Sequence, residues 1–225
     1  MGMGERIIGA IRERQDRVRL KQTGPIGEFW RAGGNELLTR DLPLDSHNVV
    51  IDGGAYKGEW LDSVALQYGC FIESYEAVPE FAQHLSQRYA RNSRISVHAC
   101  ALGSENGSAV IALADNGSTI LPQRSRGASP SVQITTRDTP TELRRIAQQH
   151  PIGCVKLNVE GSEYEILESL ERNEGFGVSK SWLVQFHHVD EASARRRQRI
   201  QDALTATHRC AWCFDFIWEL WIRKE

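Results

Sequence analysis

From residue 48 onward, short apolar runs alternate with longer stretches in which apolar residues recur at helical spacing. The runs at 48–52, 71–75 and 95–99 predict buried strands, and the stretches at 59–68 and 79–91 predict helices. An order of strand, helix, strand, helix, strand is typical of a parallel sheet with helices on both faces. The pattern therefore predicts an α/β fold.

The alternation is interrupted at 104–137 and then resumes. β-like runs at 109–113 and 131–136 flank a stretch rich in Gly, Ser and Pro at 115–130, which predicts a β excursion or flexible flap attached to the main sheet. Further expected elements are helices at 141–150, 162–171 and 191–207, strands at 154–159 and 182–187, and two strands within 210–223. A parallel sheet closed by an antiparallel terminal pair makes one domain, here 46–225.

Residues 1–45 form a charged leader before this domain. Isoleucine, valine and leucine interleave with arginine and glutamate over its first 20 residues, which predicts an amphipathic helix. A loop should follow at 24–27, where Gly24, Pro25 and Gly27 interrupt the pattern. We expect this helical segment to act as a lid over a ligand site in the following domain.

Composition narrows the class of protein. The chain has 225 residues, of which 40% are hydrophobic and 25% charged, which is an ordinary globular balance. A net charge of −2 disfavours nucleic acid as a partner, and no apolar stretch is long enough to span a membrane. Five cysteines indicate reduced thiols in a cytoplasmic protein, and the lone pair Cys210 and Cys213 lacks the further ligands of a zinc site. The sequence specifies no oligomeric state.

The end of the first predicted strand carries the most informative motif, Asp52-Gly-Gly-Ala-Tyr-Lys-Gly58. Gly53, Gly54 and Gly58 allow a tight turn and close approach of the backbone to a ligand. The motif is not the dinucleotide fingerprint, because Ala55 stands where glycine is required. A carboxylate before the glycines would repel a pyrophosphate, so Asp52 favours a cationic ligand such as S-adenosylmethionine over NAD.

An acidic residue also ends the second predicted strand. Glu76 follows Asp52 at a spacing typical of a carboxylate that accepts hydrogen bonds from ribose hydroxyls. The alternative is a glycine-rich turn with an unrelated, solvated glutamate. Together, Asp52 and Glu76 indicate a nucleoside-containing cofactor at the carboxyl edge of the sheet.

Several segments in order resemble the FkbM family of S-adenosylmethionine-dependent methyltransferases. They are Val50-Ile-Asp-Gly-Gly-Ala-Tyr-Lys-Gly58, Ser74-Tyr-Glu-Ala-Val-Pro79, Val97-His-Ala-Cys-Ala-Leu-Gly103, Ser131-Val-Gln-Ile-Thr-Thr-Arg-Asp138, Val155-Lys-Leu-Asn-Val-Glu-Gly-Ser-Glu163 and Val184-Gln-Phe-His187. The resemblance implies a class I (Rossmann-like) methyltransferase fold, with a seven-stranded, mostly parallel sheet. It also implies transfer of a methyl group to a hydroxyl oxygen of a small molecule such as a sugar, polyketide or other secondary metabolite, with S-adenosylhomocysteine as product.

The resemblance assigns roles residue by residue. The cofactor-binding residues that it and the turn indicate are Asp52, Gly53, Gly54, Ala55, Gly58, Glu76, Ala101, Leu102 and Asn158, of which Ala101 and Leu102 would line the adenine. Lys156, Glu160 and Glu163 fall on the family's Lys-x-Asp-x-Glu-Gly-x-Glu block. The chain departs from the family at Asn158 and Gln185, where the family has Asp and Glu, and an amide cannot act as a general base.

The remaining catalytic candidates are Glu160, His187 and His188. A histidine with its usual pKa of about 6.5 is suited to take a proton at neutral pH. The alternative for each histidine is a strand-end residue with satisfied hydrogen bonds, and Glu160 could instead hold a metal or the amino group of the cofactor. No metal site is expected.

Two other functions remain open from the sequence. One is a nucleotide-dependent oxidoreductase on a similar sheet, against which Asp52 and Ala55 argue. The other is a catalytically inactive relative that binds the cofactor and acts through partners, which Asn158 and Gln185 suggest.

Overall fold

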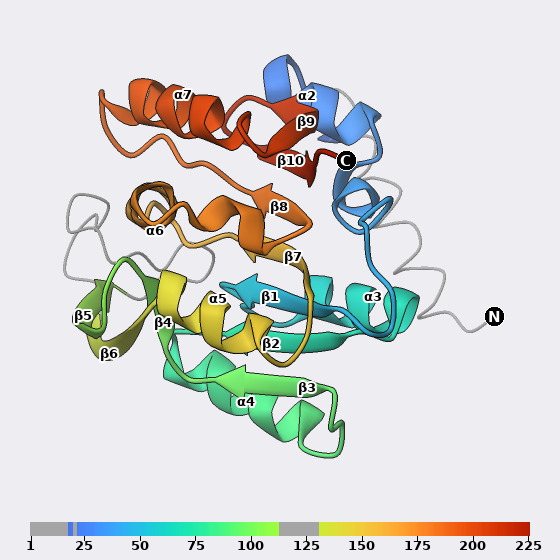
Figure 1. Ribbon diagram of the computed structural model, residues 1–225, viewed down its shortest axis with the longest axis vertical. Helices are drawn as coiled ribbons and strands as arrows, with labels where there is room; N and C mark the ends of the chain where they lie inside the picture. Colours follow the sequence, from blue (N-terminus) through green and yellow to red (C-terminus); the bar gives the residue numbers. More distant parts are fainter. Residues whose placement is uncertain (1–17, 20–21, 113–130) are drawn as a thin grey trace. The chain divides into compact units, whose positions relative to one another are not determined.

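The computed structural model describes residues 18–19, 22–112 and 131–225 (Figure 1). The chain divides into two compact units, Met1–Asp41 and Leu42–Glu225. The first contains α2 (Gly24–Arg31) and the 3₁₀ helix η1 (Gly34–Leu38). The helices of the second are α3 (Glu59–Tyr68), α4 (Pro79–Tyr89), α5 (Thr139–Ala147), α6 (Glu163–Arg172), η3 (Gly175–Val178) and α7 (Ser193–Leu204). Its strands are β1 (Val49–Gly53), β2 (Phe71–Tyr75), β3 (Ile95–His98), β4 (Ala101–Gly103), β5 (Gly107–Ala112), β6 (Ser131–Asp138), β7 (Ile152–Leu157), β8 (Ser181–Val184), β9 (His208–Phe214) and β10 (Trp218–Arg223).

The first unit corrects one expectation from the sequence. The loop predicted at 24–27 is instead the start of α2. Pro25 lies in the first turn of this helix, where its missing N–H would have no partner in any case, so Gly and Pro do not prevent the helix. The amphipathic helix predicted before it falls largely on 1–17 and 20–21, outside the described residues. The lid role of the leader stays a prediction.

The main sheet confirms the predicted seven-stranded, mostly parallel architecture. Its strand order is β3-β2-β1-β7-β8-β10-β9. β10 runs antiparallel to both of its neighbours, β8 and β9, so β9 again points in the direction of the parallel strands. The order turns back at β1, which pairs with β2 on one side and β7 on the other. Ligands of open α/β sheets bind at such a point, outside the carboxyl ends of the strands.

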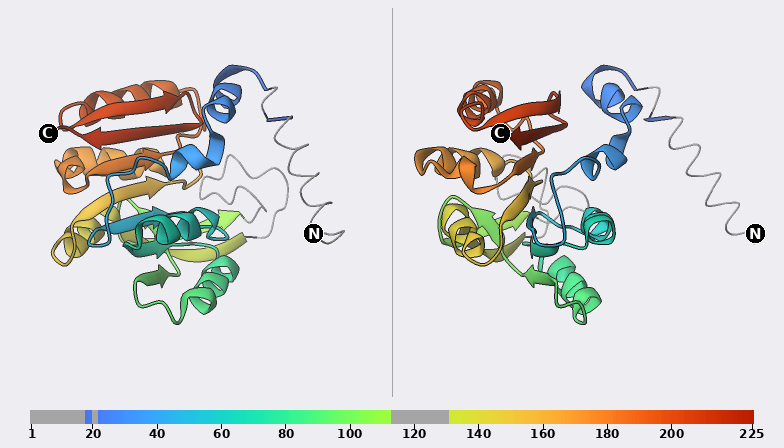
Figure 2. Two further views of the ribbon diagram at one scale, coloured as in Figure 1. Left: turned by 90° about the vertical axis from the view of Figure 1, so that its right-hand side faces the viewer. Right: turned by 45° about the vertical axis from the view of Figure 1, so that its right-hand side comes forward.

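Helices cover both faces of this sheet, with α5, α6 and α7 on one face and α3 and α4 on the other (Figure 2). Successive residues of a strand point to opposite faces. Ile51 therefore joins the core cluster that includes residues of α5 and α6. Asp52 points the other way, in register with Ser74 of β2 and Lys156 of β7. This alternation puts a buried polar row on the α3 side of the sheet.

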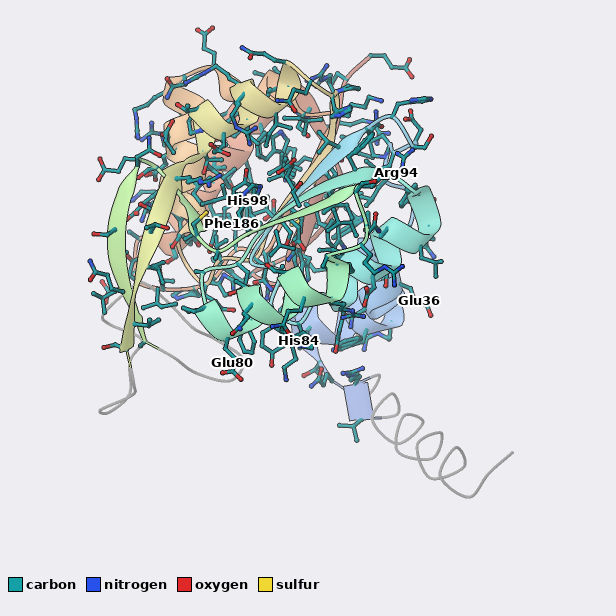
Figure 3. The ribbon with its side chains drawn as sticks, turned by 90° about the horizontal axis from the view of Figure 1, so that it is seen from below. Glu36, Glu80, His84, Arg94, His98 and Phe186 are labelled. Atoms are coloured by element: carbon teal, nitrogen blue, oxygen red, sulfur yellow. The ribbon has the colours of Figure 1, made fainter. Side chains whose placement is uncertain are left out.

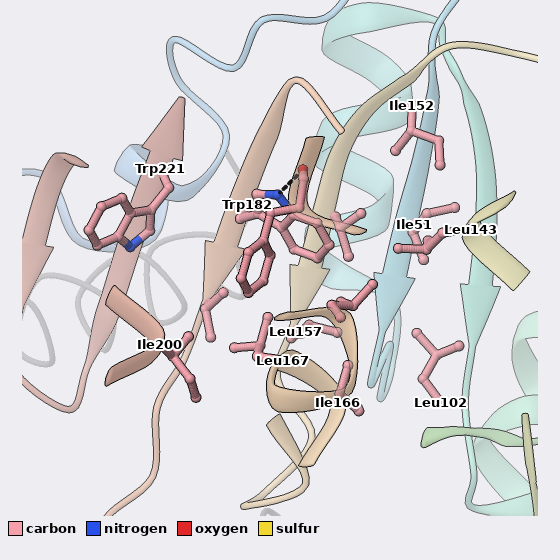
Figure 4. Packing of buried hydrophobic residues seen from close by; sticks show 14 of the residues in the cluster. Ile51, Leu102, Leu143, Ile152, Leu157, Ile166, Leu167, Trp182, Ile200 and Trp221 are labelled. Atoms are coloured by element: carbon pink, nitrogen blue, oxygen red, sulfur yellow. Dashed lines mark hydrogen bonds between the residues drawn. The ribbon is translucent and has the colours of Figure 1, made fainter. Parts of the chain in front are cut away.

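The main core lies between the sheet and α5–α7. Figure 4 shows Leu157, Leu167 and Trp182 within this core cluster, all of them fully buried. The indole N–H of Trp182 donates a hydrogen bond to the carbonyl of Phe176 at 3.1 Å, so this large side chain leaves no unpaired polar atom. On the opposite face, α4 buries Ala82 and Leu85 and exposes the side that carries Glu80 and His84 (Figure 3).

The region at 104–137 is not a simple appendage of the main sheet. β4, β6 and β5 form a separate three-stranded sheet in that order, with β4 parallel and β5 antiparallel to β6. Val78, Ile111 and Ile134 form its small core. The expected flap at 115–130 lies outside the described residues.

Several boundaries differ from the predicted ones because of local capping. α5 begins at Thr139 rather than 141, since the Asp138 carboxylate accepts a hydrogen bond from the backbone N–H of Thr141 at the helix start. α7 begins at Ser193 rather than 191, because the Ser193 hydroxyl accepts from the N–H groups of Val189 and Asp190 in a preceding turn. β8 ends at Val184, three residues earlier than expected.

Candidate active site

The glycine-rich turn after β1 packs directly against the residue that follows β7. Gly54 has a φ of 79°, and a Cβ there would lie 2.0 Å from the carbonyl oxygen of Asn158. The N–H of Asn158 donates to the carbonyl of Gly53 at 3.0 Å. The N–H of Gly58, itself at a φ of 81°, donates to the carbonyl of Ala55 at 2.9 Å and so closes the turn before α3. Only glycine fits at position 54, because the residue there needs a positive φ and has no room for a Cβ.

Asp52 is paired with a buried lysine. The Lys156 ammonium donates to Asp52 Oδ1 at 2.7 Å and to the carbonyl of Gly54 at 2.8 Å. It also lies 5.5 Å from the centroid of the Trp60 ring. The sequence interpretation, in which Asp52 alone presents negative charge to a cation, therefore needs correction, because Lys156 compensates that charge. The ion pair instead fixes the glycine turn on β7.

Glu76 binds two backbone amides at the end of β2. Its carboxylate accepts from the N–H of Tyr56 at 2.7 Å and from the N–H of Val78 at 2.8 Å. Burial raises the pKa of Glu76, and these two hydrogen bonds oppose that rise. The residue is only 5% exposed, so it is not the solvated glutamate of the alternative interpretation. Its hydrogen bond to Tyr56 attaches it to the glycine turn.

Buried side-chain oxygens that lack a hydrogen-bond partner within the described part of the chain include Ser74 Oγ and Ser162 Oγ. Asp52 Oδ2 and Asn158 Oδ1 are two more such atoms. Buried polar atoms of native proteins almost always have a partner, which can be a water or a ligand. Both atoms are acceptors, so the group they fit is a hydrogen-bond donor. An ammonium or hydroxyl group of a cofactor meets that requirement.

The segment after β7 turns sharply before α6. Glu160 has a φ of 53° and Gly161 a φ of 110°, both in the left-handed region. The N–H of Gly161 donates to Glu163 Oε2 at 2.7 Å. A left-handed conformation is unfavourable for glutamate, so its retention here indicates that the surrounding structure fixes the position of Glu160.

His187 is held between two carboxylates. Its Nδ1 lies 3.1 Å from Glu163 Oε1 and its Nε2 lies 3.5 Å from Glu160 Oε1. Its backbone N–H also donates to Glu163 Oε1 at 2.7 Å. Burial by itself would lower the pKa of His187, but the hydrogen bonds to Glu160 and Glu163 outweigh it and raise the pKa to about 9.

This pKa changes the role expected for His187. An imidazole that is already protonated at pH 7 has two donors and no acceptor, so it cannot take a proton from a substrate. The pKa of His187 thus lies above the usual value of about 6.5, and the catalytic role predicted for this residue stays a prediction. Its position instead suits an imidazolium that orients Glu160. His188 follows directly in the chain and is exposed, with its ring centroid 5.2 Å from that of Phe216.

Ala101 and Leu102 do not follow the third strand directly, as the sequence suggested. β3 ends at His98, and the two residues belong to β4 of the small sheet. The Leu102 side chain is 1% exposed and lies in the main core, and Ala101 packs on the core of the small sheet. Only their backbone is therefore placed to line a ligand.

Two contacts that build the site go beyond what the residue pattern predicted. The pairing of Lys156 with Asp52 had a signal, because a lysine within the buried run from Cys154 to Leu157 must find a partner. No feature of the sequence indicated that the backbone N–H of Tyr56 donates to Glu76, since any residue type other than proline supplies such an N–H.

Other expected features are simple to place. α7 carries the arginine-rich segment Arg195-Arg-Arg-Gln-Arg199, in which Arg196, Arg197 and Arg199 pair with carboxylates of Glu168, Glu219 and Glu171. Cys210 and Cys213 are exposed on β9 and form no disulfide.

Within the described ranges, no group of three or more His, Cys, Asp or Glu side chains could hold a metal ion. No helix of the described residues combines the length and apolar character that crossing a bilayer requires.

Comparison with protein families gives one match. The family model described as "Methyltransferase FkbM domain" matches residues 52–214, which runs from Asp52 at the glycine turn to the end of β9. No curated protein sequence matches the chain significantly.

Solved structures described as methylases or methyltransferases are similar to this chain. A putative rRNA methylase from Clostridium thermocellum is similar with a TM-score of 0.51 and 7% identity over 92% of this chain and 99% of that one. A fibrillarin pre-rRNA processing protein from Methanococcus jannaschii has a TM-score of 0.49 and 10% identity, over 84% of this chain and 73% of that one. A precorrin-6y C5,15-methyltransferase from Geobacter metallireducens has a TM-score of 0.45 and 10% identity, over 85% of this chain and 88% of that one.

Proposed function

Because the chain belongs to the FkbM methyltransferase family, we propose that it transfers a methyl group from S-adenosylmethionine to a hydroxyl oxygen of a small molecule. One observation carries the proposal. Gly53 and Gly54 contact Asn158, which stands two residues before Glu160. This contact brings the glycine turn close to the segment that carries Glu160. A binding turn and a fixed carboxylate thus share one edge of the sheet.

The residues present fit the cofactor. Gly53, Gly54 and Gly58 let the backbone approach it closely, with Ala55 in the same turn, and Glu76 would accept hydrogen bonds from its ribose. The unpartnered oxygens of Asp52 and Asn158 suit its ammonium group. When bound, S-adenosylmethionine supplies an electrophilic methyl group on a positively charged sulfur. The backbone of Ala101 and Leu102 would line its adenine.

The edge also favours a cation overall. The carboxylates of Asp52, Glu76, Glu160 and Glu163 outnumber the cations of Lys156 and His187 among the residues described above. The remaining negative charge stabilises a positively charged donor at short range, where the low dielectric strengthens the attraction. This replaces the argument from Asp52 alone.

We assign the base to Glu160. Its carboxylate would take the proton of the acceptor hydroxyl while the carbon–sulfur bond of the donor breaks and S-adenosylhomocysteine leaves. His187, whose Nε2 lies 3.5 Å from Glu160 Oε1, would orient that carboxylate. Asn158 and Gln185 cannot take this role, because amides do not accept a proton at neutral pH. Most of the acceleration must come from holding the acceptor oxygen behind the methyl group, since the sulfonium is already a good electrophile.

Calorimetry with S-adenosylhomocysteine tests the cofactor assignment. We expect Glu76→Gln to weaken binding at least about tenfold, because it removes the charge from an acceptor of ribose hydroxyls. Glu73→Gln is a matched control on the same strand, where Glu73 pairs with His98, and should bind like the wild type. A wild-type protein that does not bind S-adenosylhomocysteine would overturn the proposal.

Methyl transfer from radiolabelled S-adenosylmethionine tests the acceptor. A panel of hydroxylated small molecules and a sample of ribosomal RNA should be compared, because the putative rRNA methylase of Clostridium thermocellum shares this fold. We expect label in a small molecule, as an O-methyl ether. Label in RNA alone, or on nitrogen or carbon, would contradict the acceptor proposed. Tight cofactor binding with no product from any acceptor would favour the inactive relative.

A further inference from the structure

The turn between β9 and β10 lies at the same edge of the sheet as the candidate active site. β9 is antiparallel to β10, and β10 is antiparallel to β8, so β8 and β9 end at the same edge. Residues 215–217 connect β9 to β10, and His187 and His188 follow β8. Topology thus places the turn beside the two histidines.

Phe216 in this turn has an unusual backbone. Its φ of 55° lies in the left-handed region, where a bulky residue other than glycine or asparagine is an outlier. The ring is half-buried, and its centroid lies 5.2 Å from that of the exposed His188 ring at an angle of 56°. Phe216 packs against the margin of the main core yet stays partly open. Its left-handed backbone makes it a candidate for a functional role in addition to packing.

Arg197 of α7 holds the turn in place. This arginine is 8% exposed, and its Nε donates to Glu219 Oε1 of β10 at 2.5 Å. Its terminal nitrogen donates to Asp215 Oδ1 at 2.9 Å, and its guanidinium carbon lies 5.1 Å from the Phe216 ring centroid. The guanidinium therefore contacts both the residue before Phe216 and the ring of Phe216 itself.

The order of residues along the edge separates donor from acceptor. Strands run β2-β1-β7-β8-β10, so Glu76 and the glycine turn lie on one side of Glu160 and His187, and Phe216 lies on the other. We propose that Phe216 and His188 form the wall that contacts the acceptor, with Arg197 as the positioning residue that fixes Phe216. This inference rests on the proposed function.

The wall has a defined preference. An aromatic face carries a negative quadrupole and packs well on flat surfaces with outward C–H bonds. It suits an acceptor that has a flat apolar face beside the reacting hydroxyl, rather than an open-chain polyol.

Titration of the S-adenosylhomocysteine-loaded protein with cyclohexanol, followed by NMR of labelled His and Phe side chains, tests the wall. We expect saturable shifts of the His188 and Phe216 ring signals with cyclohexanol and none with glycerol. Phe216→Asn tolerates the left-handed backbone but removes the ring, and should weaken cyclohexanol binding at least about threefold. Phe216→Tyr keeps the ring and should bind like the wild type.

The two proposals fail in different ways. If S-adenosylhomocysteine binds but cyclohexanol gives no saturable shift, or if Phe216→Asn binds it as the wild type does, the wall is overturned and the proposed function stands. If S-adenosylhomocysteine does not bind, the proposed function itself fails.

Arg197 is tested by the same titration. Arg197→Met should weaken cyclohexanol binding without changing affinity for S-adenosylhomocysteine, and Arg197→Lys should restore part of the loss. Should Arg197→Met fail to fold, Arg197→Lys alone decides, because an unchanged cyclohexanol affinity in that variant would contradict the positioning role.

Discussion

The ammonium of Lys156 lies 2.7 Å from Asp52 Oδ1, although the two residues stand 104 positions apart in the chain. Both are buried, with side chains 5% and 1% exposed. The pair joins β1 to β7 at the strand ends where the glycine turn begins. It therefore couples the stability of the sheet to the geometry of the proposed cofactor site.

Replacing Lys156 by methionine should destabilise the protein strongly. The substitution leaves the Asp52 carboxylate buried without a counter-ion, which typically costs about 3–5 kcal/mol. Urea denaturation followed by circular dichroism measures the change in the free energy of unfolding. The double variant Lys156→Met with Asp52→Asn should recover a large part of this loss, because no buried charge remains. Equal stability of the single variant and the wild type would refute the prediction.

The stability should depend on pH through His187. Its pKa is raised from the usual value of about 6.5 to about 9, so the imidazolium stabilises the folded state fully below pH 6.5. That contribution is lost as the pH rises through 9. We expect the free energy of unfolding of the wild type to fall between pH 7 and 10 by more than that of His187→Gln.

A control separates this effect from general alkaline destabilisation. His84 is exposed on α4, so His84→Gln should follow the wild-type pH profile. Parallel curves for His187→Gln and the wild type would mean that His187 is not charged in the folded protein.

Gly54→Ala should cost more than the same change at Gly69. Both glycines have a positive φ, 79° and 59°, which alone makes alanine unfavourable by about 1–2 kcal/mol. At Gly54 the added Cβ would also meet the carbonyl of Asn158 at 2.0 Å, whereas at Gly69 no atom lies within 4 Å. Thermal unfolding of the two variants measures the difference. We expect Gly54→Ala also to lose affinity for S-adenosylhomocysteine, and a similar melting temperature for the two would argue against the close packing.

Glu160→Gln should lower kcat by about 100-fold or more at saturating S-adenosylmethionine, because it removes the proposed base but keeps the side-chain shape. Affinity for S-adenosylhomocysteine should stay within about twofold of the wild-type value. Glu165→Gln on the exposed side of α6 serves as the matched control and should be fully active. Wild-type activity of Glu160→Gln would contradict the assignment of Glu160 as the general base.

The sequence predicted the parts of this molecule that depend on local pattern. Apolar runs such as 48–52 and 71–75 are strands because both faces of a parallel sheet are covered. The glycines at 54 and 58 mark the turn because few other residues adopt its left-handed conformation. The family resemblance placed Glu160 and His187 at the carboxyl edge, where the structure brings them together.

Contacts between distant elements escaped the sequence. The pKa of His187 depends on Glu163 of α6, 24 positions away, and the spacing alone does not show that their side chains meet. Arg197 stands among other arginines at 195–199, a composition typical of a solvated helix face, yet the fold buries it against Glu219. The β-like runs at 109–113 and 131–136 correspond to β5 and β6, but the sequence did not predict that they pair with β4 in a separate sheet. The residue pattern of a strand does not show which strand it pairs with.

The position of β1 in the strand order has a consequence for biosynthesis. Val49 pairs on one side with Phe71 of β2, which is translated soon after β1. On the other side it pairs with Ile152 of β7, which is translated much later. Until β7 has been translated, a nascent chain holding β1 and β2 presents an open, apolar strand edge of the kind that promotes aggregation. A truncated product that stops before residue 152 would therefore be a client for chaperones rather than a folded fragment.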